Sequence, residues 1–220
     1  GNELNKKIVE RLNKSLLFHF YYIDINPEVD FSFKDYKINV ICNNHFIFGS
    51  LGGLYLSTYF NFDREKTKYI SLLENEIENQ FHPDGGNFEH SIPYHFFTFE
   101  ALLMFFFLRK IELISIKNSS IKKMEKISEF TKTLIKPNGA IPKYGDNDSG
   151  CILWHQNYTF TSSKRYLLDF AAIALENEDL FLSDNPSESS WLVKSLEKNK
   201  RRSQKKDNNG VHFYRDSGIL

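Results

Sequence analysis

The sequence lacks the features that several large classes of protein require. Only two of its 220 residues are cysteine, Cys42 and Cys151, so nothing indicates a disulfide framework or a zinc site. Lys plus Arg and Asp plus Glu number 28 each, and this zero net charge argues against binding nucleic acid through a basic surface. The longest apolar run, residues 101–108, is far too short to cross a bilayer. No phosphate-binding glycine loop or nucleophile elbow is present. We therefore expect no cofactor, no metal, no nucleic-acid partner and no membrane span.

What the sequence does contain is helical periodicity, with apolar residues at helical spacing and turn residues between the segments. The expected helices cover residues 4–20, 44–61, 64–81, 92–114, 119–135 and 163–181. Asp63 and Ser91 are the expected N-caps of the third and fourth of these helices. Successive helical hairpins predict an all-α fold in which residues 1–182 form a curved or toroidal array.

The remaining segments have a different composition. Residues between the first two helices should be extended, and residues 137–162 are rich in Gly, Asp, Asn and aromatic residues. Residues 183–209 contain many Ser, Lys and Asn and are expected to be a linker. The last segment, 210–220, changes character again and is expected to begin a β-sandwich domain.

Two polar clusters interrupt the start of apolar helices. The first consists of Asn43, Asn44 and His45, and the second of Glu89, His90, Ser91, Tyr94 and His95. The amino end of a helix is electropositive, so a carboxylate ligand is favoured there and a tyrosine there is more easily ionised. Structural interpretations remain open, because asparagine commonly caps helices and Tyr94 and His95 could belong to the core of their helix.

A third polar cluster, YGDNDSG at residues 144–150, is followed by Trp154 and His155. Acid and amide side chains between glycines could form a calcium-like loop, but the glutamate that an EF-hand has at its twelfth position is absent. We interpret this stretch as a polar loop at a cleft, with a plain surface turn as the alternative.

Three sequence blocks together resemble the heparinase II/III-like polysaccharide lyases. They are NNHFIFGSLGGLYLSTYF at 43–60, LENEIENQFHPDGGNFEHSIPYHFFTFEALL at 73–103 and PNGAIPKYGDNDSG at 137–150. The similarity runs from about residue 35 to 182, and the order and spacing of the blocks agree with the family. The resemblance implies an incomplete (α/α) toroid followed by an antiparallel β-sandwich, with the substrate in the cleft between them.

The resemblance also implies a reaction, β-elimination on an acidic polysaccharide that contains uronic acid. Asn44 matches the family's carboxylate-binding asparagine, His45 its neighbouring histidine, and Tyr94 its catalytic tyrosine, 50 positions after Asn44 (94 − 44 = 50). The expected substrate-binding residues are Asn43, Glu89, His95, Asp146, Asn147 and Trp154. Many relatives act outside the cytoplasm, which implies a periplasmic or secreted protein, and the frequent Lys, Asn, Ile and Phe suggest a bacterial source.

The chain departs from the family pattern in two places. Many relatives have Arg where this chain has His90, and the family's β-sandwich supplies a further catalytic histidine, a role that His212 does not fit by position. A β-sandwich domain beyond Leu220 is therefore expected to complete the cleft, and the toroid domain alone is expected to be inactive. Two alternatives remain open, namely a glycoside hydrolase that uses Glu89 with Asp146 or Asp148, and a non-catalytic carbohydrate-binding module.

Overall fold

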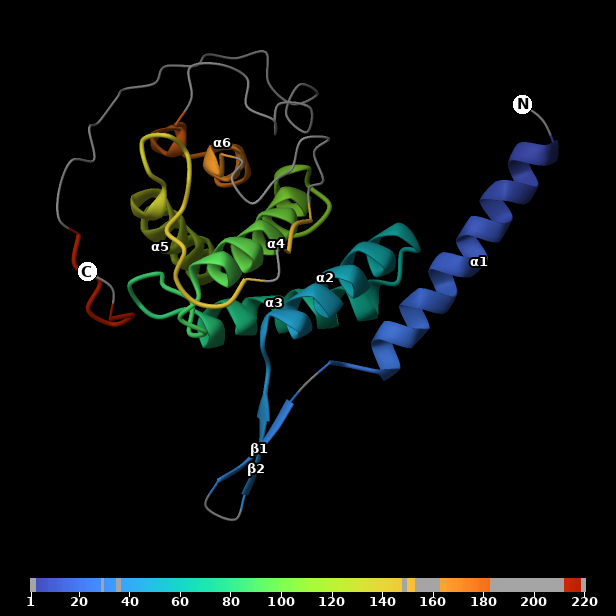
Figure 1. The fold of residues 1–220 in the computed structure, drawn as a ribbon. Coiled ribbons are helices and arrows are strands. Elements are labelled where there is room, and N and C mark those ends of the chain that lie inside the picture. Colours follow the sequence, from blue (N-terminus) through green and yellow to red (C-terminus); the bar gives the residue numbers. More distant parts are fainter. Residues whose placement is uncertain are drawn as a thin grey trace. The chain divides into compact units, whose positions relative to one another are not determined.

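The computed structural model describes residues 3–28, 30–34, 37–147, 150–152, 163–182 and 212–218 (Figure 1). Within these ranges the helices are α1 (Glu3–Ile25), α2 (Asn44–Tyr59), α3 (Asp63–Gln80), α4 (Ile92–Lys110), α5 (Asn118–Leu134), α6 (Arg165–Ala174) and the short 3-10 helix η1 (Glu178–Leu180). One antiparallel hairpin joins β1 (Asp30–Lys34) to β2 (Lys37–Ile41), with Asp30 opposite Ile41 and Lys34 opposite Lys37. The predicted all-α fold is confirmed, and the hairpin occupies the segment that was expected to be extended. The closure of the helices into a toroid stays a prediction.

Three helix ends follow one pattern that shortens the predicted helices. Asn61, Glu112 and Glu176 adopt left-handed backbone conformations, with φ of 58°, 60° and 59°. The next amide in each case reaches back five residues, for example from Leu113 N to Leu108 O at 3.0 Å. This is the Schellman motif, which satisfies the last carbonyl groups of a helix. As a result α4 ends at 110 instead of 114, and the predicted helix 163–181 is divided into α6 and η1.

The two predicted caps differ in outcome. Ser91 caps α4 as expected, because its Oγ accepts a hydrogen bond from Tyr94 N at 3.3 Å, and Pro93 lies in the first turn. Asp63 is instead the first residue of α3 and forms an ion pair with Lys66 at 2.8 Å. An acidic residue in the first turn still interacts favourably with the helix dipole.

The chain divides into two compact units, residues 1–76 and 77–220, with the boundary inside α3. In the first unit α1 packs on α2, and the ring of Tyr69 on α3 lies against Gly53, where an added Cβ would be 2.2 Å from the ring. The predicted apolar face of α1 is largely uncovered, since Ile8 and Leu12 are 56% and 53% exposed. The helix is held near its carboxyl end, where Phe20 is buried against Phe62 and Tyr69.

The second unit is built around α4. This helix packs against α6, and α6 also contacts α5 and η1. The buried residues of α4 include Phe99, Leu102, Phe105 and Phe106. Among the described residues α4 is long and apolar enough to cross a membrane, and 72% of its apolar window is buried within the structure.

Residues 212–218 lie against the turn that precedes α4. Both Ser217 N and Ser217 Oγ donate to Asp84 Oδ2, at 2.8 and 2.9 Å, and Gly86 N donates to Asp84 Oδ1 at 3.2 Å. Glycine is needed at 86, because an added Cβ would lie 2.4 Å from the Cβ of Ser217. Tyr214 packs edge-on against Phe130 at 4.6 Å between ring centroids. The described part of the expected β-strand is a bridge residue, Tyr214, followed by turns over 215–218.

The hydrogen bonds to Asp84 predict a pH-dependent contribution to stability. Burial by itself raises the pKa of Asp84, but the hydrogen bonds from Ser217, Gly86 and the backbone of Asp216 together lower it below its ordinary value of 3.8. A carboxyl whose folded pKa is depressed stabilises the fold above its unfolded pKa, and loses this contribution as pH falls through the folded pKa. We expect Asp84→Ala to lower the stability at pH 7 by about 2 kcal/mol, or Tm by about 4–8 °C.

The measurement is a pair of thermal melts at pH 7 and pH 3, where the difference between Asp84→Ala and the parent protein should be smaller at pH 3. Asp216→Ala is the matched control, because its side chain is exposed and its backbone hydrogen bond is retained. An equal loss of Tm at both pH values would contradict the charged role of Asp84.

Candidate active site

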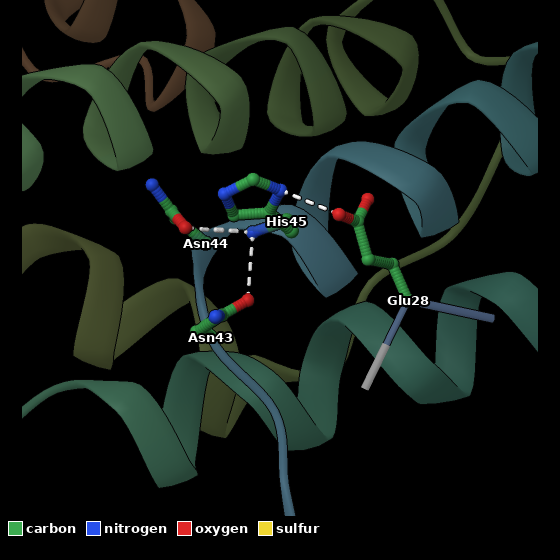
Figure 2. A network of polar contacts seen from close by, with 4 residues as sticks. All are labelled: Glu28, Asn43, Asn44 and His45. Atoms are coloured by element: carbon green, nitrogen blue, oxygen red, sulfur yellow. Dashed lines mark hydrogen bonds and ion pairs between the residues drawn. The ribbon is translucent and has the colours of Figure 1, made fainter. Parts of the chain in front are cut away.

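The start of α2 brings the first polar cluster together (Figure 2). Asn43 is the N-cap, and its Oδ1 accepts from His45 N at 3.1 Å, while Asn44 Oδ1 accepts from the same amide at 2.8 Å. Asn44 is only 4% exposed and His45 is exposed. The structural interpretation of Asn43 as a cap is thus confirmed. Asn44 is the first residue of α2 and lies in buried surroundings, where a hydrogen bond is strengthened by a low dielectric.

A carboxylate holds the imidazole of His45. Glu28 Oε1 lies 2.8 Å from His45 Nδ1, and since a carboxylate accepts, Nδ1 carries the hydrogen. Figure 2 shows the second ring nitrogen, Nε2, directed away from Glu28 on the side of Asn44. Both partners are exposed, so the pair contributes at most about 1 kcal/mol to stability. Its consequence is orientation, because it fixes the tautomer and the direction of Nε2.

Glu28 is a candidate site residue that the sequence did not reveal. It lies in the segment after α1, 17 positions before His45, and no motif spacing marks it. An acid close to a histidine in space is a tertiary feature, and the only available signal was the placement of an acid in the loop that leads to the hairpin.

Tyr94 lies in the first turn of α4 and is partly exposed. Its position is fixed by the Ser91 cap and by Pro93, which sets the backbone angle at the start of the helix. Glu89 precedes this cap in a turn where its amide donates to Asn87 Oδ1 at 2.9 Å. His90, between them, has a left-handed backbone with φ of 53° and is exposed, with its ring 5.6 Å from that of His82.

The polar loop at 144–147 wraps around the start of α4. Ile92 N donates to Tyr144 O at 2.9 Å, and Ser91 Oγ donates to Asp146 O at 2.6 Å. Gly145 has φ of 82°, and an added Cβ would be 2.6 Å from the Cα of Ser91, so the close approach requires glycine. The structure therefore brings Asp146 and Asn147, both exposed, to the helix end that carries Tyr94.

The prediction for His95 needs correction. His95 is 1% exposed, and its ring lies among Phe81, Phe96, Phe99 and Phe130. Its Nε2 is 2.8 Å from Thr131 Oγ1, and burial lowers its pKa to about 3, so the ring stays neutral. The four phenylalanine rings enclose the imidazole, so His95 packs in the core of the second unit. The interpretation of His95 as a core histidine is the correct one.

A buried carboxylate holds the other end of the polar loop. Glu100 is 1% exposed, with Oε2 accepting from Ile152 N and Oε1 from Tyr166 Oη, both at 3.1 Å. Cys151 Sγ lies 3.9 Å from Glu100 Oε1. Burial and the nearby charge of Glu100 raise the pKa of this thiol to about 11, which makes it a poor nucleophile. Both cysteines are free thiols.

The predicted site residues thus form two described groups. Asn43, Asn44 and His45 lie in the first unit, and Tyr94, Glu89, Asp146 and Asn147 lie in the second. The approach of His45 to Tyr94 stays a prediction. Trp154 and His155 lie outside the described residues, as do Asp148, Ser149 and the whole of the expected linker, 183–209. Among the residues that the structure describes, no group of three or more His, Cys, Asp or Glu side chains could hold a metal ion.

Comparison with known proteins identifies the family of the chain. The profile of the family described as Heparinase II/III N-terminus matches residues 11–170. The chain belongs to the heparinase II/III N-terminal family. The match includes the start of α2, the turn and cap before α4, and the loop at 144–147. No curated protein and no solved structure matches the chain.

Membership of the heparinase II/III N-terminal family points to a polysaccharide lyase. The amide and imidazole at the start of α2 and, in the other unit, the phenol at the start of α4 are groups that can each act in proton transfer or bind a carboxylate.

Proposed function

We propose that this chain is the helical domain of a polysaccharide lyase that cleaves a uronic-acid-containing polymer by β-elimination. The observation that carries the proposal is the start of α2, where an amide and an oriented imidazole lie at the electropositive end of a helix. Such a position suits the carboxylate of a uronic acid. The family match supports the same reaction class.

The chemistry explains why these groups are needed. A base removes the proton at C5, a double bond forms between C4 and C5, and the C4–O bond breaks, with a proton passing to the departing oxygen. The C5 proton is weakly acidic while the uronate carboxylate carries its full charge, because the intermediate would add a second charge beside it. The site must therefore neutralise that carboxylate and stabilise the enolate-like intermediate.

Each residue has a distinct role in the proposal. Asn44 donates its amide hydrogen atoms to the uronate carboxylate. His45 donates from Nδ1 to Glu28, and this bond directs the opposite ring nitrogen, Nε2, to the ligand. Tyr94 gives the proton to the departing oxygen. The family resemblance gives the tyrosine the role of base as well in some relatives, and it implies a further catalytic histidine in a β-sandwich domain.

The substrate-binding residues follow from the loop at the start of α4. Asp146 and Asn147 are exposed beside the Ser91 cap and can bind sugar hydroxyls near Tyr94. Glu89 lies two residues before the same cap. We assign these three residues to substrate binding, and we keep Trp154 as a candidate from the sequence.

The test is to incubate the full-length protein, including any domain that follows this chain, with uronate polymers such as glycosaminoglycans and alginate. Elimination produces an unsaturated sugar that absorbs in the near ultraviolet, together with one new reducing end per cleavage. New reducing ends without absorbance would establish a hydrolase instead. Binding without either product would indicate a carbohydrate-binding module, and both outcomes would refute the proposal.

A further inference from the structure

The solvent-facing side of α1 carries one continuous stripe of exposed residues. Its members recur at alternating steps of four and three residues, which is the spacing of the seam between two paired helices. The members of the stripe are Lys7, Arg11, Lys14, Phe18, Tyr21 and Ile25, and all of them are exposed. The three apolar side chains, Phe18, Tyr21 and Ile25, are 68%, 54% and 73% exposed. Large apolar side chains lined up in this way indicate a surface that meets a partner.

The contacts of α1 within the first unit lie on a different side of the helix. Phe20 is 2% exposed and packs against Phe62 and Tyr69. Asp24 accepts from Lys68 Nζ at 2.6 Å and from Tyr69 Oη at 2.9 Å. Helical geometry places the stripe on the side away from Phe20 and Asp24. The first unit therefore uses one side of α1 for its own packing and leaves the stripe available.

The order of the side chains along the stripe indicates which partner fits it. The amino-terminal half carries three cations and the carboxyl-terminal half carries two aromatic rings and an isoleucine, placed symmetrically about Leu16. Two antiparallel copies of α1 would therefore pair Lys14 with Phe18, Arg11 with Tyr21, and Lys7 with Ile25, each pair occurring twice. A cation over an aromatic ring is a favourable contact, and the methylene groups of a lysine pack well on an apolar side chain. The stripe is complementary to itself.

Other partners fit the stripe less well. Two parallel copies would bring each cation against its own counterpart, and like charges in contact are unfavourable. A polysaccharide or a lipid surface with negative charge along its whole length would meet cations in only one half of the stripe. Lys14 also donates to Glu10 on the same helix at 2.7 Å, but an exposed ion pair of this kind contributes little and does not prevent a further contact.

We propose that two copies of this chain associate through this stripe, with their α1 helices antiparallel. The contact is isologous, because both copies use the same surface, and it closes at two copies. Each copy contributes the exposed side of one helix, which is a small interface, so the dimer is weak and depends on concentration. This inference does not depend on the proposed function.

The test is sedimentation equilibrium of the 220-residue chain over a series of concentrations. The parent chain should pass from monomer to dimer with a micromolar Kd. Tyr21→Arg should weaken the dimer at least about tenfold, because it places an arginine opposite Arg11 of the other copy. Adding Arg11→Tyr to the same chain exchanges the two residues, so that each antiparallel pair again contains one arginine and one tyrosine. The double variant should therefore dimerise with a Kd within about threefold of the parent value.

Val9→Arg is the matched control, because Val9 is 51% exposed on the opposite side of α1. It adds the same charge to the same helix and should leave Kd unchanged. Phe18→Ala is a second stripe variant that should weaken the dimer, and thermal melts of all variants should match the parent, since the side chains changed are exposed.

Three results would each overturn the inference, namely a chain that stays monomeric at every concentration, a dimer that persists in Tyr21→Arg, and a double variant that does not regain the dimer. Binding of alginate or of anionic lipid vesicles to a monomeric chain, lost in Phe18→Ala, would assign the stripe to that partner and would also overturn it.

Discussion

Tyr94→Phe is expected to lower kcat of the full-length protein on its uronate polymer by about a thousandfold, which is within the range for loss of a general acid or base. The change removes one oxygen atom and keeps the ring, so the packing at the start of α4 is preserved. KM should change by no more than about twofold, because the proposed role of the phenol lies in the transition state.

The matched control is Tyr59→Phe, which makes the same chemical change on an exposed tyrosine at the end of α2, where the hydroxyl donates to Asn13 Oδ1 at 2.8 Å. This variant should keep full activity. Steady-state rates of near-ultraviolet absorbance give kcat and KM for both variants. If Tyr94→Phe retained the turnover of the parent, Tyr94 would be a binding or structural residue and the proposed mechanism would be wrong.

The helices could be predicted from the sequence because their apolar spacing is local information. Their ends were predicted less well for a physical reason. The residues that adopt the left-handed terminating conformation, Glu112 and Glu176 among them, are not glycine, so the usual signal of a helix end is missing. Ser91, a residue with a strong preference for the N-cap, could be assigned correctly from the sequence alone.

The candidate site was predictable only where function depends on adjacent residues. Asn44 and His45 are neighbours in the chain, and a pattern of residues can mark them. Glu28 meets His45 across a hairpin, and Glu100 meets Ile152 and Tyr166 across more than 50 positions, so neither could be assigned before the fold was known. His95 shows the opposite problem, because its polar side chain suggested a site while its position among phenylalanines made it part of the core.

Glu100→Ala is expected to be the most destabilising of the substitutions considered, by about 3 kcal/mol, or a Tm about 6–12 °C lower. The change leaves the buried hydroxyl of Tyr166 and the amide of Ile152 without this acceptor, and it opens a space beside α4. Glu100→Gln, which keeps the size and one acceptor oxygen, should cost less. Glu129→Ala is the control, because that carboxylate is exposed and forms an ion pair with Lys126, which is exposed as well.

The same substitution should also release the loop that carries Cys151, and this second effect distinguishes Glu100 from an ordinary core residue. The thiol has a pKa of about 11 because it is buried beside Glu100, so it reacts slowly with alkylating reagents at pH 8. In Glu100→Ala the freed loop should expose the thiol, its pKa should fall towards the ordinary value, and alkylation should be faster by about tenfold.

The double variant Glu100→Ala with Tyr166→Phe should lose less stability than the sum of the single changes, since the two side chains share one hydrogen bond. Additive losses with an unchanged alkylation rate would mean that Glu100 does not hold the loop in place.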